Sequence, residues 1–199
     1  MIKKTVVLFL FLFSITAFSQ DAKLNEIAPN FKLQDSNGNE HSLNDFKGKL
    51  VVLEWISYEC PFVKKHYDSK NMQTLQEKYT KQGVIWLTIC SSAESKQGNF
   101  TNDEINSRSQ KHNAKFTAYL IDANGEVGKM YGAKTTPHMY IINKEGKLVY
   151  AGGIDDKAST DIEDIKSAKN YVSLALDELL AGKNVSVQSS KPYGCSVKY

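Results

Sequence analysis

The sequence lacks a strong net charge, internal repeats and low-complexity linkers. Its 25 Lys and Arg residues are balanced by 22 Asp and Glu residues in a chain of 199. If Lys3 and Lys4 are removed with an N-terminal leader, 23 basic residues remain against 22 acidic ones, a net charge of about +1. A balance this even gives no support to nucleic acid or acidic lipid as a partner.

Long apolar runs are also missing, except near the N-terminus. Two lysines precede an apolar stretch at residues 6–13, and Ala17 and Ser19 occupy small-residue positions before a cleavage point. This stretch is shorter than the roughly 20 residues that span a bilayer. We therefore interpret residues 1–20 as a signal peptide and not as a membrane anchor. We expect a mature protein of about 180 residues, enough for one domain, in the bacterial periplasm or secreted, without stable membrane insertion.

Cysteine is scarce, with only Cys60, Cys90 and Cys195 in the chain. Disulfides persist in exported proteins, because the compartment is oxidising. Three cysteines permit any one of three single disulfides and leave one thiol over. An odd count outside the cytosol indicates a free or cycling sulfur.

The rest of the chain alternates strand-like and helix-like segments, which is typical of an α/β domain. Strands are expected at residues 31–33, 40–42, 50–56, 84–90, 118–121, 139–142 and 148–151. Helices are expected at residues 61–68, 72–79, 103–112, 126–131 and 168–179. The Asn37-Gly38 pair is a hairpin signal between the first two strands. The segment between strands 50–56 and 84–90 has the length of a βαβ crossover, so we expect these two strands to be parallel.

Cys60 occupies the position best suited to a reactive sulfur, because it follows a buried strand and precedes Pro61. Proline is favoured as the first residue of a helix, since its missing N–H has no partner there. Unpaired N–H groups and the dipole at a helix start stabilise a thiolate and lower the cysteine pKa from about 8.5. The basic residues 64–66 are expected to add positive charge within two turns. An inert buried thiol or a structural half-cystine is the alternative interpretation.

Five stretches of the chain match the motifs of a known family. They are Ala28–Phe31, Leu43–Lys49, Glu59–Val63, Thr135–Pro137 and Tyr140–Gly146. With these motifs the chain resembles the thioredoxin-like superfamily, and more closely its redoxin branch, the alkyl hydroperoxide reductase/thiol-specific antioxidant group. The resemblance implies a three-layer α/β sandwich with a central mixed sheet, an N-terminal hairpin extension and a C-terminal tail. It assigns residues 21–182 to the redoxin domain and residues 183–199 to the tail.

The resemblance also implies a role for Thr136 and Pro137. The bond between them is expected to be cis, and their loop is expected to pack beside Cys60. In that arrangement the backbone of Thr136 is presented to an incoming peptide or mixed disulfide.

A second sulfur is needed to release a mixed disulfide. The position three residues after Cys60, which holds a cysteine in thioredoxin, is Val63 in this chain. The second sulfur must then come from Cys90 or Cys195. We favour Cys195, because a tail next to Gly194 is expected to be mobile and accessible, whereas Cys90 closes a buried strand. A permanent Cys60–Cys195 staple is the structural alternative.

A peroxiredoxin-like peroxidase is the alternative enzyme. Ser57 matches the hydroxyl that peroxiredoxins carry three residues before their peroxidatic cysteine. The proline and the arginine of the peroxiredoxin site correspond to Leu53 and Pro137, and the only arginine of the chain is Arg108. Peroxide cleavage depends on donors that stabilise the leaving oxygen, so we rank disulfide chemistry above peroxide reduction.

A copper-handling or non-catalytic binding module is the alternative of another class, because soft thiolates favour Cu(I). Cys60 with His66 or His138 could form part of such a site, although a histidine near a helix start is more often a surface or capping residue. His41 and His112 are expected to be exposed, and residues 155–156 are expected to form a turn.

We therefore predict an exported thiol–disulfide oxidoreductase with Cys60 as nucleophile, Cys195 as resolving thiol, and Thr136 and Pro137 in the docking surface. Its expected partners are protein or small-molecule thiols and disulfides, with peroxide as a further candidate. No cofactor, bound metal or nucleic acid is expected.

Overall fold

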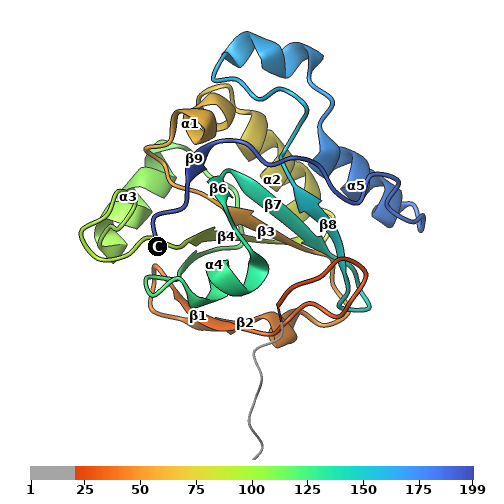
Figure 1. Ribbon diagram of the computed structural model, residues 1–199, viewed down its shortest axis with the longest axis horizontal. Helices are drawn as coiled ribbons and strands as arrows, with labels where there is room; N and C mark the ends of the chain where they lie inside the picture. Colours follow the sequence, from red (N-terminus) through yellow and green to blue (C-terminus); the bar gives the residue numbers. More distant parts are fainter. Residues whose placement is uncertain (1–20) are drawn as a thin grey trace, which may run out of the picture.

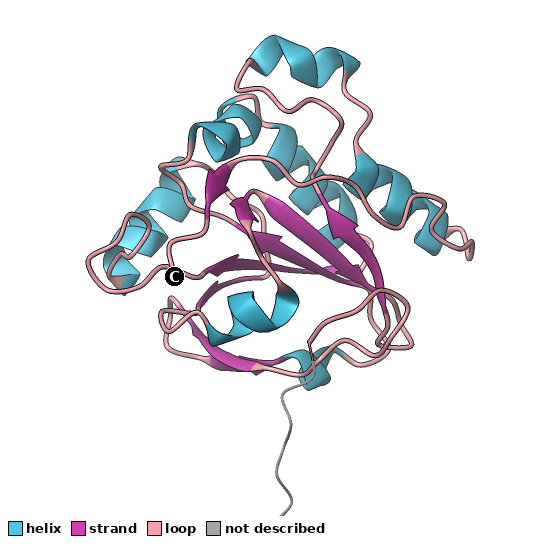
Figure 2. Ribbon diagram, viewed as in Figure 1, coloured by secondary structure: helices cyan, strands magenta, loops and turns pink. Residues whose placement is uncertain are grey.

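The computed structural model describes residues 21–199, so the predicted signal peptide at residues 1–20 lies outside the described residues. Seven strands form one sheet in the order β2-β1-β5-β4-β3-β7-β8 (Figures 1 and 2). The strands are β1 (Lys32–Asp35), β2 (Glu40–Ser42), β3 (Val51–Trp55), β4 (Ile85–Cys90), β5 (Ala118–Ile121), β7 (His138–Ile142) and β8 (Leu148–Gly152). Two short strands, β6 (Thr135–Thr136) and β9 (Cys195–Ser196), pair with each other in a second sheet.

The main sheet is mixed. Strands β3, β4 and β5 are parallel neighbours, which confirms the predicted crossover between the first two. Strand β7 runs antiparallel to β3 and to β8, and β1 runs antiparallel to β2 and to β5. The expected hairpins β1–β2 and β7–β8 are both present. The parallel strands therefore end on the same edge of the sheet. Strand β4 ends there at Cys90, and β3 ends there at Trp55, in the segment that leads to Cys60.

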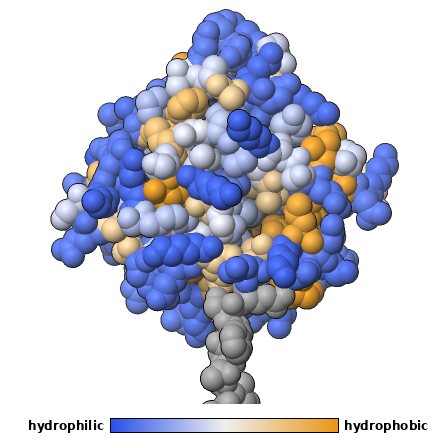
Figure 3. Space-filling view, in the orientation of Figure 1, coloured by the Kyte–Doolittle hydropathy of each residue, from blue (hydrophilic) through white to orange (hydrophobic). Residues whose placement is uncertain are grey.

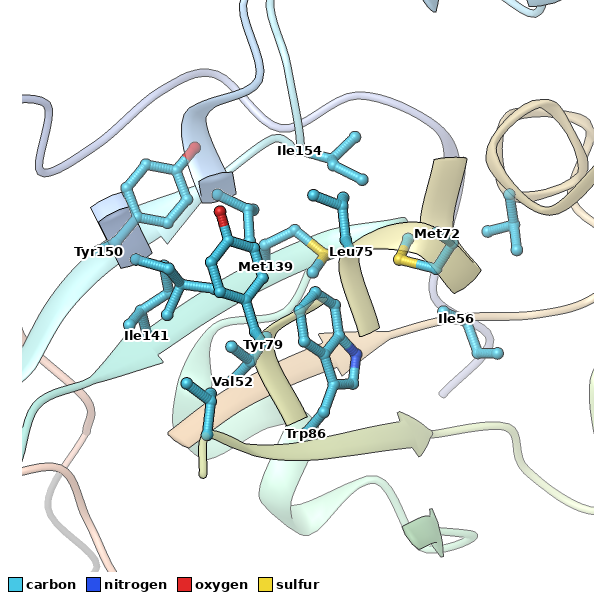
Figure 4. Close-up of a cluster of buried hydrophobic side chains, with 14 of the residues drawn as sticks. Val52, Ile56, Met72, Leu75, Tyr79, Trp86, Met139, Ile141, Tyr150 and Ile154 are labelled. Carbon is cyan, nitrogen blue, oxygen red and sulfur yellow. The ribbon is translucent and has the colours of Figure 1, made fainter. Parts of the chain in front are cut away.

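Helices cover both faces of the sheet. They are α1 (Pro61–Asp68), α2 (Asn71–Thr80), α3 (Asn102–Lys111), α4 (Glu126–Tyr131) and α5 (Tyr171–Leu180). Successive strand residues face opposite sides, so Val52 joins the core beneath α1, α2 and α5, while Leu53 joins the core beneath α4. Figure 4 shows the first of these cores, in which Met72 and Tyr79 of α2 lie among strand residues. The predicted three-layer α/β sandwich with a central mixed sheet is confirmed.

The first helix begins and ends as the sequence predicts. Pro61 is its first residue and Cys60 its N-cap, and the chain breaks at Lys70, whose φ of 63° lies in the left-handed region. Two 3-10 helices, η1 (Leu43–Phe46) and η2 (Ile162–Ser167), were not predicted. The last helix starts at Tyr171, later than predicted, because the side chain of Asn170 accepts a hydrogen bond from the backbone N–H of Ser173 and caps it there.

The surface is mostly hydrophilic on the face drawn in Figure 3, with separate apolar patches. Within residues 21–199, none of the helices has the length and apolar character needed to cross a membrane.

Candidate active site

Cys60 lies at the junction of β3 and α1, held by the first turn of the helix. Its backbone N–H donates to the carbonyl of Ser57 at 3.0 Å, and its own carbonyl accepts from the N–H of Lys64 at 2.9 Å. The residue is only 1% exposed. The backbone N–H of Val63, one of the unpaired donors of the first turn, is directed at the sulfur and favours its ionised form.

The loop before β7 closes over the same sulfur. The peptide bond between Thr136 and Pro137 is cis, as expected. As a thiol, Cys60 donates from Sγ to the carbonyl oxygen of Thr136 at 3.0 Å. Thr136 is itself buried, so its backbone and side chain form one wall of the site.

The C-terminal tail brings the second cysteine to this wall. Strand β9 runs antiparallel to β6, with Cys195 opposite Thr136. The side chains of Cys195 and Cys60 are within hydrogen-bonding contact, and all three cysteines of the chain are free thiols. The tail was expected to be mobile, but it forms a paired strand at the site.

The two adjacent thiols have opposite pKa shifts. Burial opposes ionisation of Cys60, but hydrogen bonds from the Cys195 side chain and from the backbone N–H groups of Cys195 and Val63 outweigh it. The pKa of Cys60 is therefore lower than that of an ordinary cysteine. Burial, together with the hydrogen bond to Cys60 and its charge, raises the pKa of Cys195 to about 11, although Lys198 acts in the opposite direction. Cys60 is therefore the thiol of the pair that ionises more readily, and Cys195 is the one that keeps its proton to higher pH.

The basic residues after Cys60 have a different role from the one predicted. Lys65 is buried, and its Nζ donates to the carbonyl of Lys157 at 2.8 Å. His66, expected at the surface, is 0% exposed. Lys64, Lys65 and His66 are not among the main interactions that shift the pKa of Cys60. Hydrogen-bond donors, and not cations, lower the pKa of this thiol.

His66 instead anchors the tail. Asn71 Nδ2 donates to His66 Nδ1 at 2.9 Å, which leaves the proton on Nε2 to donate to the hydroxyl oxygen of Tyr193 at 3.1 Å. The Tyr193 hydroxyl donates in turn to Asp155 Oδ1 at 2.6 Å. Burial lowers the pKa of His66 to about 3, so the ring is neutral at physiological pH. This buried chain of hydrogen bonds fixes the backbone two residues before Cys195.

Sequence reasoning missed this anchor. Asp155 was expected only to turn the chain, and it does accept from the backbone N–H of Lys157 at 2.9 Å. Its burial and its bond to Tyr193 are additional, and they join residues far apart in the chain. The only sequence signal at this place was the Asp155-Asp156 pair after two glycines. That pair predicted a turn and did not indicate the hydrogen bond to Tyr193.

Glu54 is a second buried acid that sequence reasoning missed, because it is embedded in the apolar run of β3. Its Oε1 accepts from the hydroxyl of Tyr67 at 3.0 Å, and its Oε2 accepts from Trp86 Nε1 at 2.6 Å and Gln76 Nε2 at 3.0 Å. Thr88 Oγ1 adds a further donor at 3.0 Å. Burial raises the pKa of Glu54 despite these donors.

Cys90 lies at the same sheet edge but in a separate environment. Its Sγ contacts Ser92 Oγ and the carbonyl oxygen of Gly98, both at 3.4 Å. Burial raises the pKa of Cys90, so it is a core thiol at neutral pH. The hydroxyl of Ser57 is buried and has no hydrogen-bond partner within the part of the chain that the structure describes.

The histidines provide little for a metal. Within residues 21–199, no group of three His, Cys, Asp or Glu side chains is arranged to hold an ion. Both ring nitrogens of His66 are hydrogen-bonded, and Nδ1 of His138 contacts the hydroxyl of Tyr140 at 3.1 Å. His112, expected to be exposed, is half-buried and stacks on Tyr58, while half-buried His41 contacts Asp35 at 2.9 Å.

A cysteine at the start of α1, facing a cis-proline loop at the end of a mixed sheet, defines a protein of the thioredoxin-like class. Residues 24–151 match the model of the AhpC/TSA family. The chain belongs to this family, within the redoxin branch of the thioredoxin-like superfamily.

The chain is also similar to individual known proteins. Thiol-disulfide oxidoreductase ResA of Bacillus cereus is 30% identical over 134 residues, which are 66% of this chain and 72% of that protein. The crystal structure of an uncharacterized conserved protein from Geobacillus kaustophilus is 31% identical, with a TM-score of 0.73 over 89% of this chain and 92% of that one. A hypothetical protein from Sinorhizobium meliloti 1021 is 27% identical, with a TM-score of 0.74 over 90% and 96% of the two chains.

Proposed function

We propose that this protein is a thiol–disulfide oxidoreductase in which Cys60 attacks a substrate disulfide and Cys195 resolves the adduct. The activity in the name of the ResA relatives supports the enzyme class. One observation carries the assignment of roles: the two thiols contact each other with opposite pKa shifts, beside the cis-proline loop.

The reaction consists of two displacements. The thiolate of Cys60 attacks one sulfur of a substrate disulfide, forming a mixed disulfide and releasing the other substrate sulfur as a thiolate. Cys195 then loses its proton to solvent and attacks Cys60, so that a Cys60–Cys195 disulfide forms and the second substrate thiolate leaves. The substrate gains two electrons, which the two enzyme thiols lose. An external dithiol restores them to the reduced state.

The electrostatics order these steps. While Cys60 is a thiolate, its charge helps to keep the pKa of Cys195 high, at about 11. Once Cys60 is bound in a mixed disulfide, that charge is gone, and the nearby Lys198 favours the thiolate of Cys195. Burial, the largest cause of the raised pKa, remains, but Cys195 ionises more readily once there is an adduct to resolve than before the adduct forms.

The wider setting is part of the proposal. Residues 1–20 are a signal peptide, residues 21–182 the redoxin domain and residues 183–199 a tail that supplies the resolving thiol. The mature protein acts outside the cytoplasm on protein or small-molecule thiols and disulfides. N-terminal sequencing of the protein from the periplasm or medium tests the predicted cleavage.

The test of the assigned roles uses three single variants and an insulin-type disulfide substrate. Cys60→Ser should abolish reduction. Cys195→Ala should allow one attack per molecule and accumulate a mixed disulfide that mass spectrometry locates at Cys60. Cys90→Ala is the matched control and should retain full turnover.

Three results would contradict the proposal. Turnover that survives Cys60→Ser would exclude this nucleophile, and unimpaired turnover in Cys195→Ala would exclude this resolving thiol. Rapid consumption of hydrogen peroxide by the reduced protein, without disulfide exchange, would assign a peroxidase instead.

A further inference from the structure

The edge of β6 beside Cys60 is occupied by the chain itself. Thr136 pairs with Cys195, and both the side chain and the backbone N–H of Cys195 contact the sulfur of Cys60. An extended polypeptide that adds a strand to a sheet edge uses the main-chain groups of that edge. An external polypeptide that pairs with Thr136 in the same way must therefore first displace β9.

The tail is held on both sides of this contact. Before β9, Tyr193 donates to the buried carboxylate of Asp155 at 2.6 Å. After β9, the hydroxyl of Tyr199 donates to the carbonyl of Ala133 at 2.7 Å. Figure 1 shows the tail running from α5 across β6 to the end marked C. These two hydrogen bonds hold β9 in place along the edge of β6.

Gly194 shows how closely the backbone next to β9 approaches Thr136. A Cβ atom at this position would lie 2.0 Å from the carbonyl oxygen of Thr136 and 2.7 Å from its carbon. Its φ of 137° is also in the region that favours glycine. A segment that follows the same backbone path beside Thr136 therefore needs glycine immediately before its cysteine.

Resting on the proposed function, we propose that β9 is an intramolecular stand-in for the substrate. The substrate is an extended polypeptide segment with glycine before its reacting cysteine, and it pairs with Thr136 in place of β9. Cys60 attacks the disulfide of that segment and the distal sulfur leaves as a thiolate. When β9 returns to the edge, Cys195 attacks Cys60 and the segment leaves as a thiolate. The edge of β6 thus first binds the substrate segment and then, when β9 pairs with it again, releases that segment.

The test measures the first displacement in full-length chains that carry Cys195→Ser, so that the adduct stays on Cys60. Three chains are compared: Cys195→Ser alone, with Gly194→Ala, and with Gly182→Ala. Gly182 is the matched control, because it also has a positive φ, 72°, but a Cβ there meets nothing within 4 Å. Substrates are short peptides with a central Gly-Cys or Val-Cys, each capped on sulfur by thionitrobenzoate, and the small disulfide dithiobis-nitrobenzoate. Release of thionitrobenzoate is followed by its absorbance.

Loosening β9 should accelerate attack on the peptide specifically. We expect Gly194→Ala to raise the rate with the Gly-Cys peptide by about tenfold or more, and Gly182→Ala to leave it unchanged. The rate with the small disulfide should change far less, because that disulfide has no backbone to pair with Thr136. The Val-Cys peptide should react about tenfold more slowly than the Gly-Cys peptide with each chain.

An unchanged peptide rate in Gly194→Ala, or equal acceleration of peptide and small disulfide, would overturn the competition. Equal rates for Gly-Cys and Val-Cys would overturn the substrate preference. If Gly194→Ala does not fold, Tyr199→Phe replaces it, and loss of one hydrogen bond should accelerate the peptide about fivefold. Failure of the proposed function looks different, because the small disulfide would then fail to react at Cys60 in every chain.

Discussion

At the scale of single residues, the sulfur of Cys60 is controlled by hydrogen-bond donors at its own helix start and from the tail. Val63 supplies a backbone N–H, and Cys195 supplies both a backbone N–H and a side chain. Burial alone would have raised the pKa of Cys60. The ionisation of the Cys60 sulfur therefore depends on a strand that lies far away in sequence.

This dependence gives a pH prediction. The pKa of Cys60 should lie below that of an ordinary cysteine, about 8.5, and Cys195→Ala should raise it by removing a side-chain donor. Titration of the ultraviolet absorbance of the thiolate measures both values. Cys90→Ala is the control and should leave the Cys60 titration in place. An unchanged midpoint in Cys195→Ala would contradict the assigned donor.

Local sequence signals were sufficient for the position of Cys60 and insufficient for its surroundings. The apolar run and Pro61 predicted the helix start, because the residues that set a helix start lie next to one another in the sequence. The burial of His66 and its bond to Tyr193 depend on the tail folding back onto α1. No spacing within residues 60–66 carries that information. The missed roles of Asp155 and Glu54 have the same cause.

At the scale of elements, β9 is the feature that sequence periodicity could not predict. Alternation and helical spacing located the longer strands and helices to within a few residues. A strand of two residues, Cys195–Ser196, has no period to detect. Its existence depends on pairing with β6 and on the anchor at Tyr193, both of which are tertiary contacts.

The anchor can be tested by removing one oxygen. Tyr193→Phe should leave Asp155 Oδ1 without its 2.6 Å donor and the proton on His66 Nε2 without an acceptor. Asp155 Oδ1 still accepts from the backbone N–H of Lys157. The lost Tyr193 bond and the buried His66 N–H without an acceptor should lower the free energy of unfolding by about 2 kcal/mol. Urea denaturation measures the loss, and limited proteolysis should cut the tail sooner. Tyr171→Phe is the matched control, because the Tyr171 hydroxyl makes no hydrogen bond within residues 21–199. Equal stability of the two variants would contradict the anchor.

At the scale of the whole molecule, the core contains titratable groups as well as apolar ones. His66 and His138 are buried, and burial lowers their pKa values to about 3 and about 4. Glu54 and Asp155 are also buried, and burial raises the pKa of both. Folding shifts the pKa of each of the four groups in the direction of its neutral form, so stability depends on pH through each of them.

The contribution of His66 has a definite sign. Below about pH 6.5 a histidine in the unfolded chain binds a proton, while folded His66 stays neutral down to about pH 3. The unfolded state then holds more protons, so the free energy of unfolding falls as the pH falls between these values. At pH 5 the loss should be about 2 kcal/mol.

Comparison with His66→Gln isolates this term. The wild type should lose about 2 kcal/mol more than the variant between pH 7 and pH 5, as measured by urea denaturation at both values. The pH 7 measurement corrects for any general cost of the substitution, since residue 66 is mostly neutral there in both the folded and the unfolded state. Parallel losses in the two proteins would show that His66 is protonated in the folded state.

The pairing of β9 with β6 also has a consequence for the unfolded chain. Cys60 and Cys195 are 135 positions apart (195 minus 60). A covalent bond between them would close most of the polypeptide into a ring and remove loop-closure entropy from the unfolded state, a gain of about 5 kcal/mol at this length. Oxidation of the pair would make the enzyme harder to unfold, so each catalytic cycle would alternate between a looser, reduced molecule and a tighter, oxidised one.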